Sequence, residues 1–175
     1  MSDDAKIACN FTPEAQVSES TSEKAVKTRF RGYKSLLIKL VGKGPMEETK
    51  IDEIGKAEFG KRWAGVFASD EASRLLRMKD CFAIVNTATS LGRGSHWLGV
   101  HMTPGGAGWL YDSFGREASQ VIWRLNRAAL AENVALHGTN PNHEQRGTSA
   151  VCGHLSLSWL LCVRDLGIRA VAAAV

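Results

Sequence analysis

The first regular pattern of apolar residues lies between residues 29 and 41. Five of them are spaced so that they share one side of a helix: Phe30, Tyr33, Leu36, Leu37 and Leu40. A stretch with two glycines and a proline, residues 42–45, follows and would end that helix. The sequence therefore predicts a helix over residues 29–41.

The chain before this helix is polar. Residues 1–28 are rich in Ser, Thr, Glu and Lys, so they offer too little apolar burial to offset the entropy of ordering. We predict a disordered acidic and polar tail over residues 1–28 and a single domain over residues 29–175. Within that domain the pattern over residues 46–59 is weak, and a short helix over residues 69–78 is predicted to be capped at its start.

Three short runs rich in apolar residues predict strands of one sheet. They cover residues 81–88, 97–102 and 108–111. Between the second and third run lies Pro104-Gly105-Gly106. Proline presets one backbone angle and glycine permits positive ones, so this triplet predicts a tight turn. The second and third strands should therefore be antiparallel neighbours.

The second half of the chain contains two helical patterns. The first covers residues 116–133, and a short strand is expected over residues 134–137. A polar loop over residues 138–147 separates it from a run, residues 149–166, that is apolar on nearly every face. Such a helix is buried at the centre of a domain. The predicted fold is α+β, with a small central mixed or antiparallel sheet packed against this buried helix.

Composition fits one globular domain. The chain has 175 residues, of which 44% are hydrophobic and 23% charged, values that are ordinary for a globular domain. Its longest apolar run, residues 155–163, is far shorter than the roughly 20 residues that a membrane span needs. The N-terminus lacks a basic segment followed by an apolar core, so we expect a protein that is not secreted.

The cysteines and histidines do not have the spacing of a metal site. Four cysteines are widely separated, which favours free thiols: Cys9, Cys81, Cys152 and Cys162. Four histidines also lack close Cys or carboxylate partners, so we expect no metal and no cofactor: His101, His137, His143 and His154.

Charge is unevenly distributed along the chain. The net charge is +4, but residues 1–23 carry five acidic side chains and one lysine, whereas residues 24–62 carry eleven Lys or Arg against five Asp or Glu. This basic segment, from Lys24 to Arg62, is either a solvated face or a site that binds DNA without sequence preference.

Cys152 stands at or just inside the start of the predicted buried helix. The partial positive charge and free amides at a helix N-terminus stabilise a thiolate, which is the nucleophilic form of cysteine. An isolated cysteine is more often a buried structural residue. The other residues of the pattern decide between these interpretations.

Three further residues would complete a nucleophilic site. His96 begins the second predicted strand and Asp112 ends the third. The carboxylate can therefore orient an imidazole that takes the thiol proton. Gln145 lies seven residues before Cys152, where its amide and the Cys152 backbone amide could form an oxyanion hole. Each residue alone is weak evidence, but the ordered set is much less expected by chance.

These motifs resemble the adenovirus endopeptidase, or adenain, family of cysteine proteases. The similarity covers residues 63–161 and is carried by IVNTA, G-x-HW, YDSFG and a glutamine seven residues before the Cys-Gly pair. The resemblance implies that His96, Asp112 and Cys152 form a catalytic triad and that Gln145 builds the oxyanion hole.

Two departures from that family limit what can be transferred. The triad acid here is Asp, as in the related ubiquitin-like-protein proteases, where many adenovirus enzymes have Glu, and this change should preserve the chemistry. Val134 stands where those enzymes have the cysteine that binds an activating peptide. We therefore do not expect activation through that disulfide, although activation by a peptide or by DNA remains open.

The resemblance implies a viral or virus-like maturation endopeptidase that cleaves structural precursors at Gly-containing sites. We expect it to act as a monomer in the virion and in the host cell interior, nucleus or cytoplasm. The alternatives are a deSUMOylase or deubiquitinase, an acetyltransferase of the same clan, and a non-enzymatic nucleic-acid binder. The last of these leaves the ordered set of site residues unexplained.

Overall fold

The computed structural model describes residues 21–139, 145 and 150–175. Helix α1 (Glu23–Val41) begins where the Ser22 hydroxyl accepts a hydrogen bond from the Ala25 amide, and it ends before Gly42, whose φ is 82°. The helix predicted from residue 29 is confirmed, but the tail boundary at residue 28 is wrong. Residues 23–28 are helical because Val26 extends the buried face of the helix by one more turn. The first 20 residues of the predicted tail lie outside the described residues.

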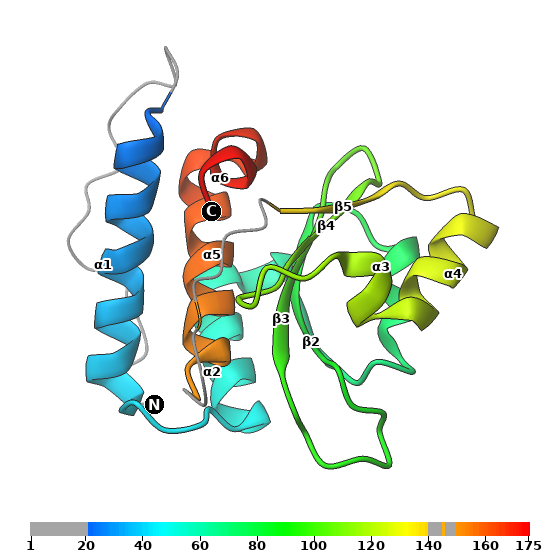
Figure 1. Ribbon diagram of the computed structural model, residues 1–175, viewed down its shortest axis with the longest axis horizontal. Coiled ribbons are helices and arrows are strands. Elements are labelled where there is room, and N and C mark those ends of the chain that lie inside the picture. The colour runs from blue at the N-terminus through cyan, green and yellow to red at the C-terminus, as the bar shows by residue number, and fades with distance from the viewer. Residues whose placement is uncertain (1–20, 140–144, 146–149) are drawn as a thin grey trace.

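A five-stranded mixed sheet forms the centre of the molecule (Figure 1). Its strands are adjacent in sequence order: β1 (Trp63–Phe67), β2 (Cys81–Asn86), β3 (Trp97–Met102), β4 (Gly108–Tyr111) and β5 (Leu136–Gly138). The β2–β3 and β3–β4 pairs are antiparallel, whereas the two edge strands β1 and β5 run parallel to their neighbours. The predicted hairpin is confirmed, with Gly106 at a φ of 88° in its turn.

Helices cover both faces of the sheet (Figure 1). One face carries α1, α2 (Glu48–Phe59), α5 (Cys152–Leu166) and α6 (Ile168–Ala174). The other face carries α3 (Ala118–Val121), α4 (Trp123–Ala131) and the 3-10 helix η3 (Ala72–Arg77). A further 3-10 turn, η2 (Gly60–Arg62), leads from α2 into β1. The predicted α+β class is confirmed, and each face of the sheet has its own apolar core.

Two predicted elements differ from the structure, and one observed strand was not predicted. The helix expected over residues 116–133 is broken at Ile122, whose φ of −128° and ψ of 69° are not helical and whose side chain is buried. The helix expected over residues 69–78 is a 3-10 helix that begins at Ala72 without a side-chain cap. Strand β1 was not predicted, because its side chains are all half-buried and its backbone pairs irregularly at Gly65.

Helix α5 is the buried centre of the helical layer, as predicted. All residues from Gly153 to Val163 are buried. The helix approaches β3 at Gly99, where an added Cβ would lie 3.2 Å from the Trp159 ring and 3.3 Å from the Ser156 carbonyl oxygen. Glycine at this position therefore sets the distance between the helical layer and the sheet.

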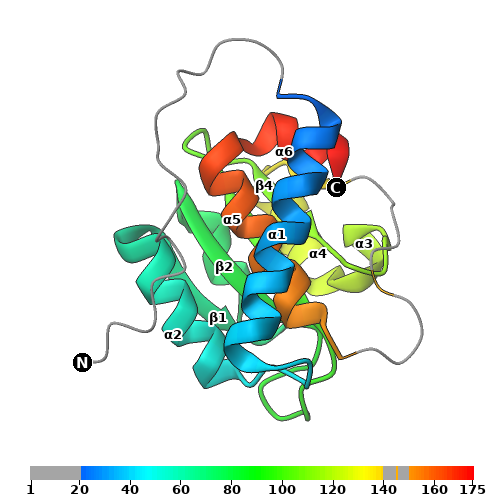
Figure 2. The ribbon, with the colours of Figure 1, turned by 90° about the vertical axis from the view of Figure 1, so that its left-hand side faces the viewer.

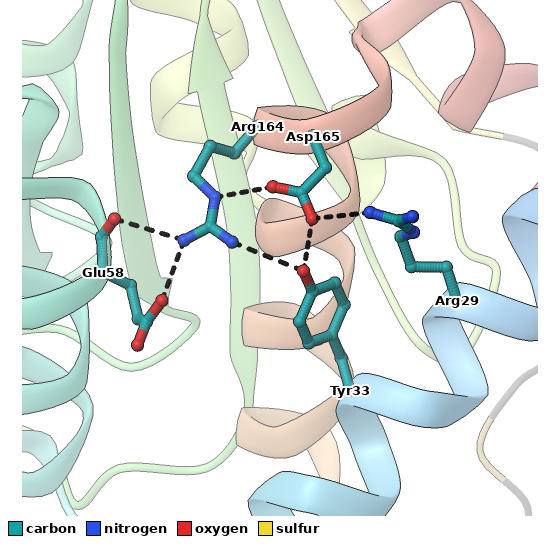
Figure 3. A network of polar contacts seen from close by, with 5 residues as sticks. All are labelled: Arg29, Tyr33, Glu58, Arg164 and Asp165. Carbon is teal, nitrogen blue, oxygen red and sulfur yellow. Dashed lines mark hydrogen bonds and ion pairs between the residues drawn. The ribbon is translucent and has the colours of Figure 1, made fainter. Parts of the chain in front are cut away.

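Helix α1 packs along the outer side of α5 and α6 (Figure 2). Polar side chains join α1, α2 and α5 at one level (Figure 3). Arg164 donates to Glu58 at 2.8 Å and to Asp165 at 2.8 Å, while the Tyr33 hydroxyl donates to Asp165. Burial, with the adjacent Asp165, raises the pKa of Tyr33 to about 12.

Within the described residues, no helix combines the length and apolar character of a membrane span.

Candidate active site

Three residues of the predicted site come from the ends of three elements. Cys152 is the first residue of α5, His96 directly precedes β3, and Asp112 directly follows β4. The β3–β4 register pairs Gly99 with Tyr111, so its continuation places Asp112 opposite Leu98 and diagonal to His96. Diagonal neighbours on one sheet face are close enough for long side chains to meet.

His96 and Asp112 form a buried ion pair. The distance between His96 Nε2 and Asp112 Oδ1 is 2.7 Å, and the two residues are 6% and 7% exposed. Asp112 also accepts hydrogen bonds from the Phe114 amide to Oδ1 at 3.1 Å and from Arg116 Nε to Oδ2 at 2.7 Å. Burial alone would raise the pKa of Asp112, but the bonds from His96, Arg116 and Phe114 lower it to about 2.

The Cys152 thiol also interacts with the His96 imidazole. Burial alone would raise its pKa, but hydrogen bonds with the His96 side chain and with the Trp97 and Gly153 backbones hold the pKa below its ordinary value. Burial would likewise lower the pKa of His96, whereas its bonds to Asp112 and Cys152 raise it. The site therefore favours a thiolate next to an imidazolium, which is the reactive form of a Cys-His pair.

Packing around the pair fixes the start of α5. The Trp97 indole donates to the Met46 carbonyl at 3.0 Å, and the Ser156 hydroxyl donates to the Trp97 carbonyl at 3.0 Å. An added Cβ on Gly153 would lie 3.1 Å from Met46 Cβ and 3.4 Å from the Trp97 ring. A glycine directly after Cys152 thus lets the segment before α2 close over the first turn of α5.

Gln145 is hydrogen-bonded to Ser113, the residue that follows Asp112. Its Oε1 accepts a hydrogen bond from the Ser113 hydroxyl at 2.7 Å, and its backbone amide donates to the Ser113 carbonyl at 2.9 Å. Gln145 is 5% exposed and Ser113 is fully buried. The structure thus brings Cys152, His96 and Asp112 into one hydrogen-bonded chain and holds Gln145 beside it through Ser113.

Arg116 and Ser113 were not among the predicted site residues. Arg116 follows Asp112 by four positions, an acid–base spacing that was available as a signal but is common on protein surfaces. Arg116 also contacts an aromatic ring that is close to it in sequence. Its guanidinium lies 5.2 Å from the centre of the Phe114 ring, and the Phe114 ring lies 4.8 Å from the His96 ring. No sequence signal distinguished Ser113 from other serines.

Four other cysteines and histidines are buried outside this hydrogen-bonded chain: Cys81, Cys162, His101 and His154. Burial raises the pKa of Cys81, and it raises the pKa of Cys162 to about 12. His101 contacts the Cys81 carbonyl and His154 contacts the Gly42 carbonyl. Cys9 and His143 lie outside the described residues, and among those described no group of three His, Cys, Asp or Glu is arranged to hold a metal ion.

Comparisons with known proteins do not assign the chain to a family. No protein-family model matches the chain, and no curated protein sequence matches it either. The geometry and chemistry of these side chains are therefore the basis for assigning a function.

Proposed function

We propose that this chain is a cysteine endopeptidase with a Cys152-His96-Asp112 triad and Gln145 in the oxyanion hole. One observation supports this most strongly, namely the hydrogen-bonded series from the Cys152 thiol through the His96 imidazole to the Asp112 carboxylate. A buried structural cysteine would have its pKa raised, as Cys162 has, whereas the pKa of Cys152 is lowered.

The chemistry follows from the positions of these groups. The Cys152 sulfur would attack the carbonyl carbon of the scissile peptide, and the oxyanion would accept hydrogen bonds from the Cys152 backbone amide and the Gln145 side chain. His96 would give its proton to the leaving amine, which breaks the C–N bond and leaves a thioester. His96 would then take a proton from water as the water oxygen attacks the thioester, and cleavage of the C–S bond would release the acid and restore the Cys152 thiolate next to the His96 imidazolium.

Substrate and setting are part of the same proposal. The resemblance to adenovirus-type endopeptidases favours cleavage of structural precursors at Gly-containing sites during virion maturation, in the virion or in the host cell interior. A protease that removes ubiquitin or SUMO would use the same residues on a Gly-Gly substrate, so the substrate has to be tested directly.

The test compares peptides with Gly-Gly sites against SUMO and ubiquitin fusions. Cleavage of the peptides by the wild type, and none by Cys152→Ala, is the expected result. Cys81→Ala is the matched control, because Cys81 is a thiol away from the site and should leave cleavage unchanged. Cleavage of the fusions alone would assign the deSUMOylase or deubiquitinase class instead.

A second experiment tests acetyl transfer. The same triad could transfer the acyl group of a thioester either to water or to another acceptor. The protein is incubated with acetyl-coenzyme A, and the mass of Cys152 is followed. Acetylation of Cys152 and of an added protein acceptor, without peptide cleavage, would contradict the endopeptidase proposal.

A further inference from the structure

Arg116 reaches Asp112 because the chain turns sharply after β4. The Gly115 amide donates to the Asp112 carbonyl at 2.8 Å, and Gly115 has a φ of 66°. A residue with a side chain rarely adopts this conformation. The turn brings Arg116 back over Asp112, where its Nε donates to Oδ2 at 2.7 Å.

Both oxygens of the Asp112 carboxylate therefore have fixed donors. Oδ1 accepts from His96 and from the Phe114 amide, while Oδ2 accepts from Arg116. Donors on both oxygens fix the plane of the carboxylate and hence the lone pair that faces His96. The Arg116 guanidinium also lies over the Phe114 ring, which packs against the His96 ring.

Arg116 also balances the charge of the reactive state. Within the described residues, the titratable or charged side chains that contact the Asp112 carboxylate are His96 and Arg116, and Cys152 adjoins His96. With a thiolate, an imidazolium and a carboxylate, these three groups have a net charge of −1 without Arg116 and zero with it. A nearby positive charge favours the ionised form of an acid.

We infer that Arg116 is a positioning residue of this site, which orients Asp112 toward His96 and sets the pH range over which Cys152 is a thiolate. Its side chain is 46% exposed, so its replacement removes little buried surface. The effect on turnover rests on the proposed function, whereas the effect on thiol reactivity does not.

The test measures the rate of Cys152 alkylation by iodoacetamide as a function of pH. In Arg116→Gln the loss of a positive charge should raise the pKa of Cys152, so the rise in alkylation rate should move to higher pH. Arg116→Lys keeps the charge and should keep the midpoint near that of the wild type. Arg127→Gln, which removes an exposed positive charge on α4, is the matched control.

Turnover of a cleaved peptide gives the second measurement. Arg116→Gln should lower kcat about tenfold, the order expected for loss of one charge-assisted hydrogen bond, with little change in KM. Arg116→Lys should recover part of this loss.

Three outcomes would overturn the inference. They are an alkylation profile of Arg116→Gln that coincides with the wild type, a shift that Arg127→Gln reproduces, and a shift that Arg116→Lys shows in full. Because alkylation needs no substrate, a protein that cleaves no peptide still decides the role of Arg116, and the proposed function fails separately. Arg116→Ala repeats the measurement if the Gln variant does not fold by circular dichroism.

Discussion

Ser113 binds Gln145 twice, through a hydroxyl donor to Oε1 at 2.7 Å and a carbonyl acceptor for the backbone amide at 2.9 Å. Because Oε1 accepts the bond from Ser113, the orientation of the side-chain amide is fixed. Its Nε2 group is the donor proposed for the oxyanion. Ser113 directly follows Asp112. The residue proposed for the oxyanion hole is therefore aligned by the same strand end that supplies the triad acid.

Gln145→Ala should lower kcat about 100-fold, because it removes one donor to the oxyanion. Ser113→Ala should lower kcat less, by about tenfold, because it leaves the donor in place but removes one hydrogen bond that orients it. Steady-state kinetics on a cleaved peptide check both. A Ser113→Ala variant that is slower than Gln145→Ala would show that the hydroxyl acts otherwise than through Gln145.

Asp112→Asn should lower kcat by about 100-fold or more with little change in KM, because the amide cannot stabilise the His96 imidazolium. The variant should also lose the acidic onset of Cys152 alkylation, since a neutral His96 no longer stabilises the thiolate. Asp80→Asn is the control, as its carboxylate pairs with Arg62 away from the site. Equal kcat in Asp112→Asn and in the wild type would remove the carboxylate from the mechanism.

Cys152 should be alkylated at lower pH than an ordinary thiol. Against the effect of burial, hydrogen bonds with His96 and with the Trp97 and Gly153 backbones hold its pKa below the ordinary value, so its thiolate should be present at a lower pH than that of an ordinary cysteine. Cys81 and Cys162, whose pKa values are raised, should react later. Mass spectrometry of the protein treated at pH 6 measures this.

The same protein in guanidinium chloride is the reference for that experiment, because unfolding gives all its thiols an ordinary pKa. Cys152 should exceed the reference rate at pH 6, while Cys81 and Cys162 should fall below it. Modification of Cys81 ahead of Cys152 would contradict the assignment of the nucleophile.

Arg164→Ala should lower the free energy of unfolding by about 3 kcal/mol, because it removes the cation that faces a buried carboxylate. The Glu58 side chain is 1% exposed and lies 2.8 Å from Arg164 (Figure 3). Urea denaturation checks this, with Arg169→Ala on the exposed face of α6 as the control.

Adding Glu58→Ala to Arg164→Ala should recover part of that loss, since it removes the buried carboxylate that faced Arg164. Strictly additive losses in the double variant would mean that the two charges do not interact. The network should also weaken in acid, since the pKa of Asp165 is lowered by Arg164 and Tyr33 against the effect of burial. Its contribution is complete above the unfolded pKa and is lost as pH falls through the folded one.

Duplex DNA should bind to one flank of α1. Lys24, Lys27, Arg31 and Lys34 recur at intervals of three and four residues in a continuous helix, which places them on one side of it. Phosphate binding through these cations should not depend on sequence and should weaken steeply with salt, because each neutralised phosphate releases condensed counterions. Fluorescence anisotropy with two unrelated duplexes at low and physiological salt measures both effects.

The matched variants separate this flank from charge in general. Lys24→Glu with Arg31→Glu should abolish binding, whereas Lys39→Glu with Lys43→Glu, which changes the net charge equally at the other end of α1, should weaken it far less. Equal losses in the two pairs, or no binding of the wild type at low salt, would leave these residues as a solvated basic face.

The elements that the sequence predicted best are those whose local signals agree with their surroundings. Strands β3 and β4 match their predicted bounds because a Pro-Gly-Gly turn fixes the hairpin between them. Helix α5 was recognised because nearly all its faces are apolar. The start of α1 and the break at Ile122 were missed, since a single buried valine and a single buried isoleucine decide them through packing.

The same limit applies to the site. Cys152, His96 and Asp112 could be selected because their order and their places at element ends are visible in the sequence. The contacts of Arg116 and Ser113 depend on the turn at Gly115 and on the return of the chain to Gln145. Both are tertiary features, and neither has a periodic pattern.

The close approach at Gly99 has a mechanical consequence for the proposed enzyme. The nucleophile belongs to the helical layer and the base and acid belong to the sheet, so their alignment depends on the gap between two layers rather than on either alone. A methyl group at Gly99 would meet the Trp159 ring at 3.2 Å, and a shift of a few tenths of an ångström would relieve it. Such a shift would leave the fold intact but would move the Cys152 sulfur away from the His96 imidazole. Substitution of Gly99 would therefore reduce catalytic activity before it unfolded the protein.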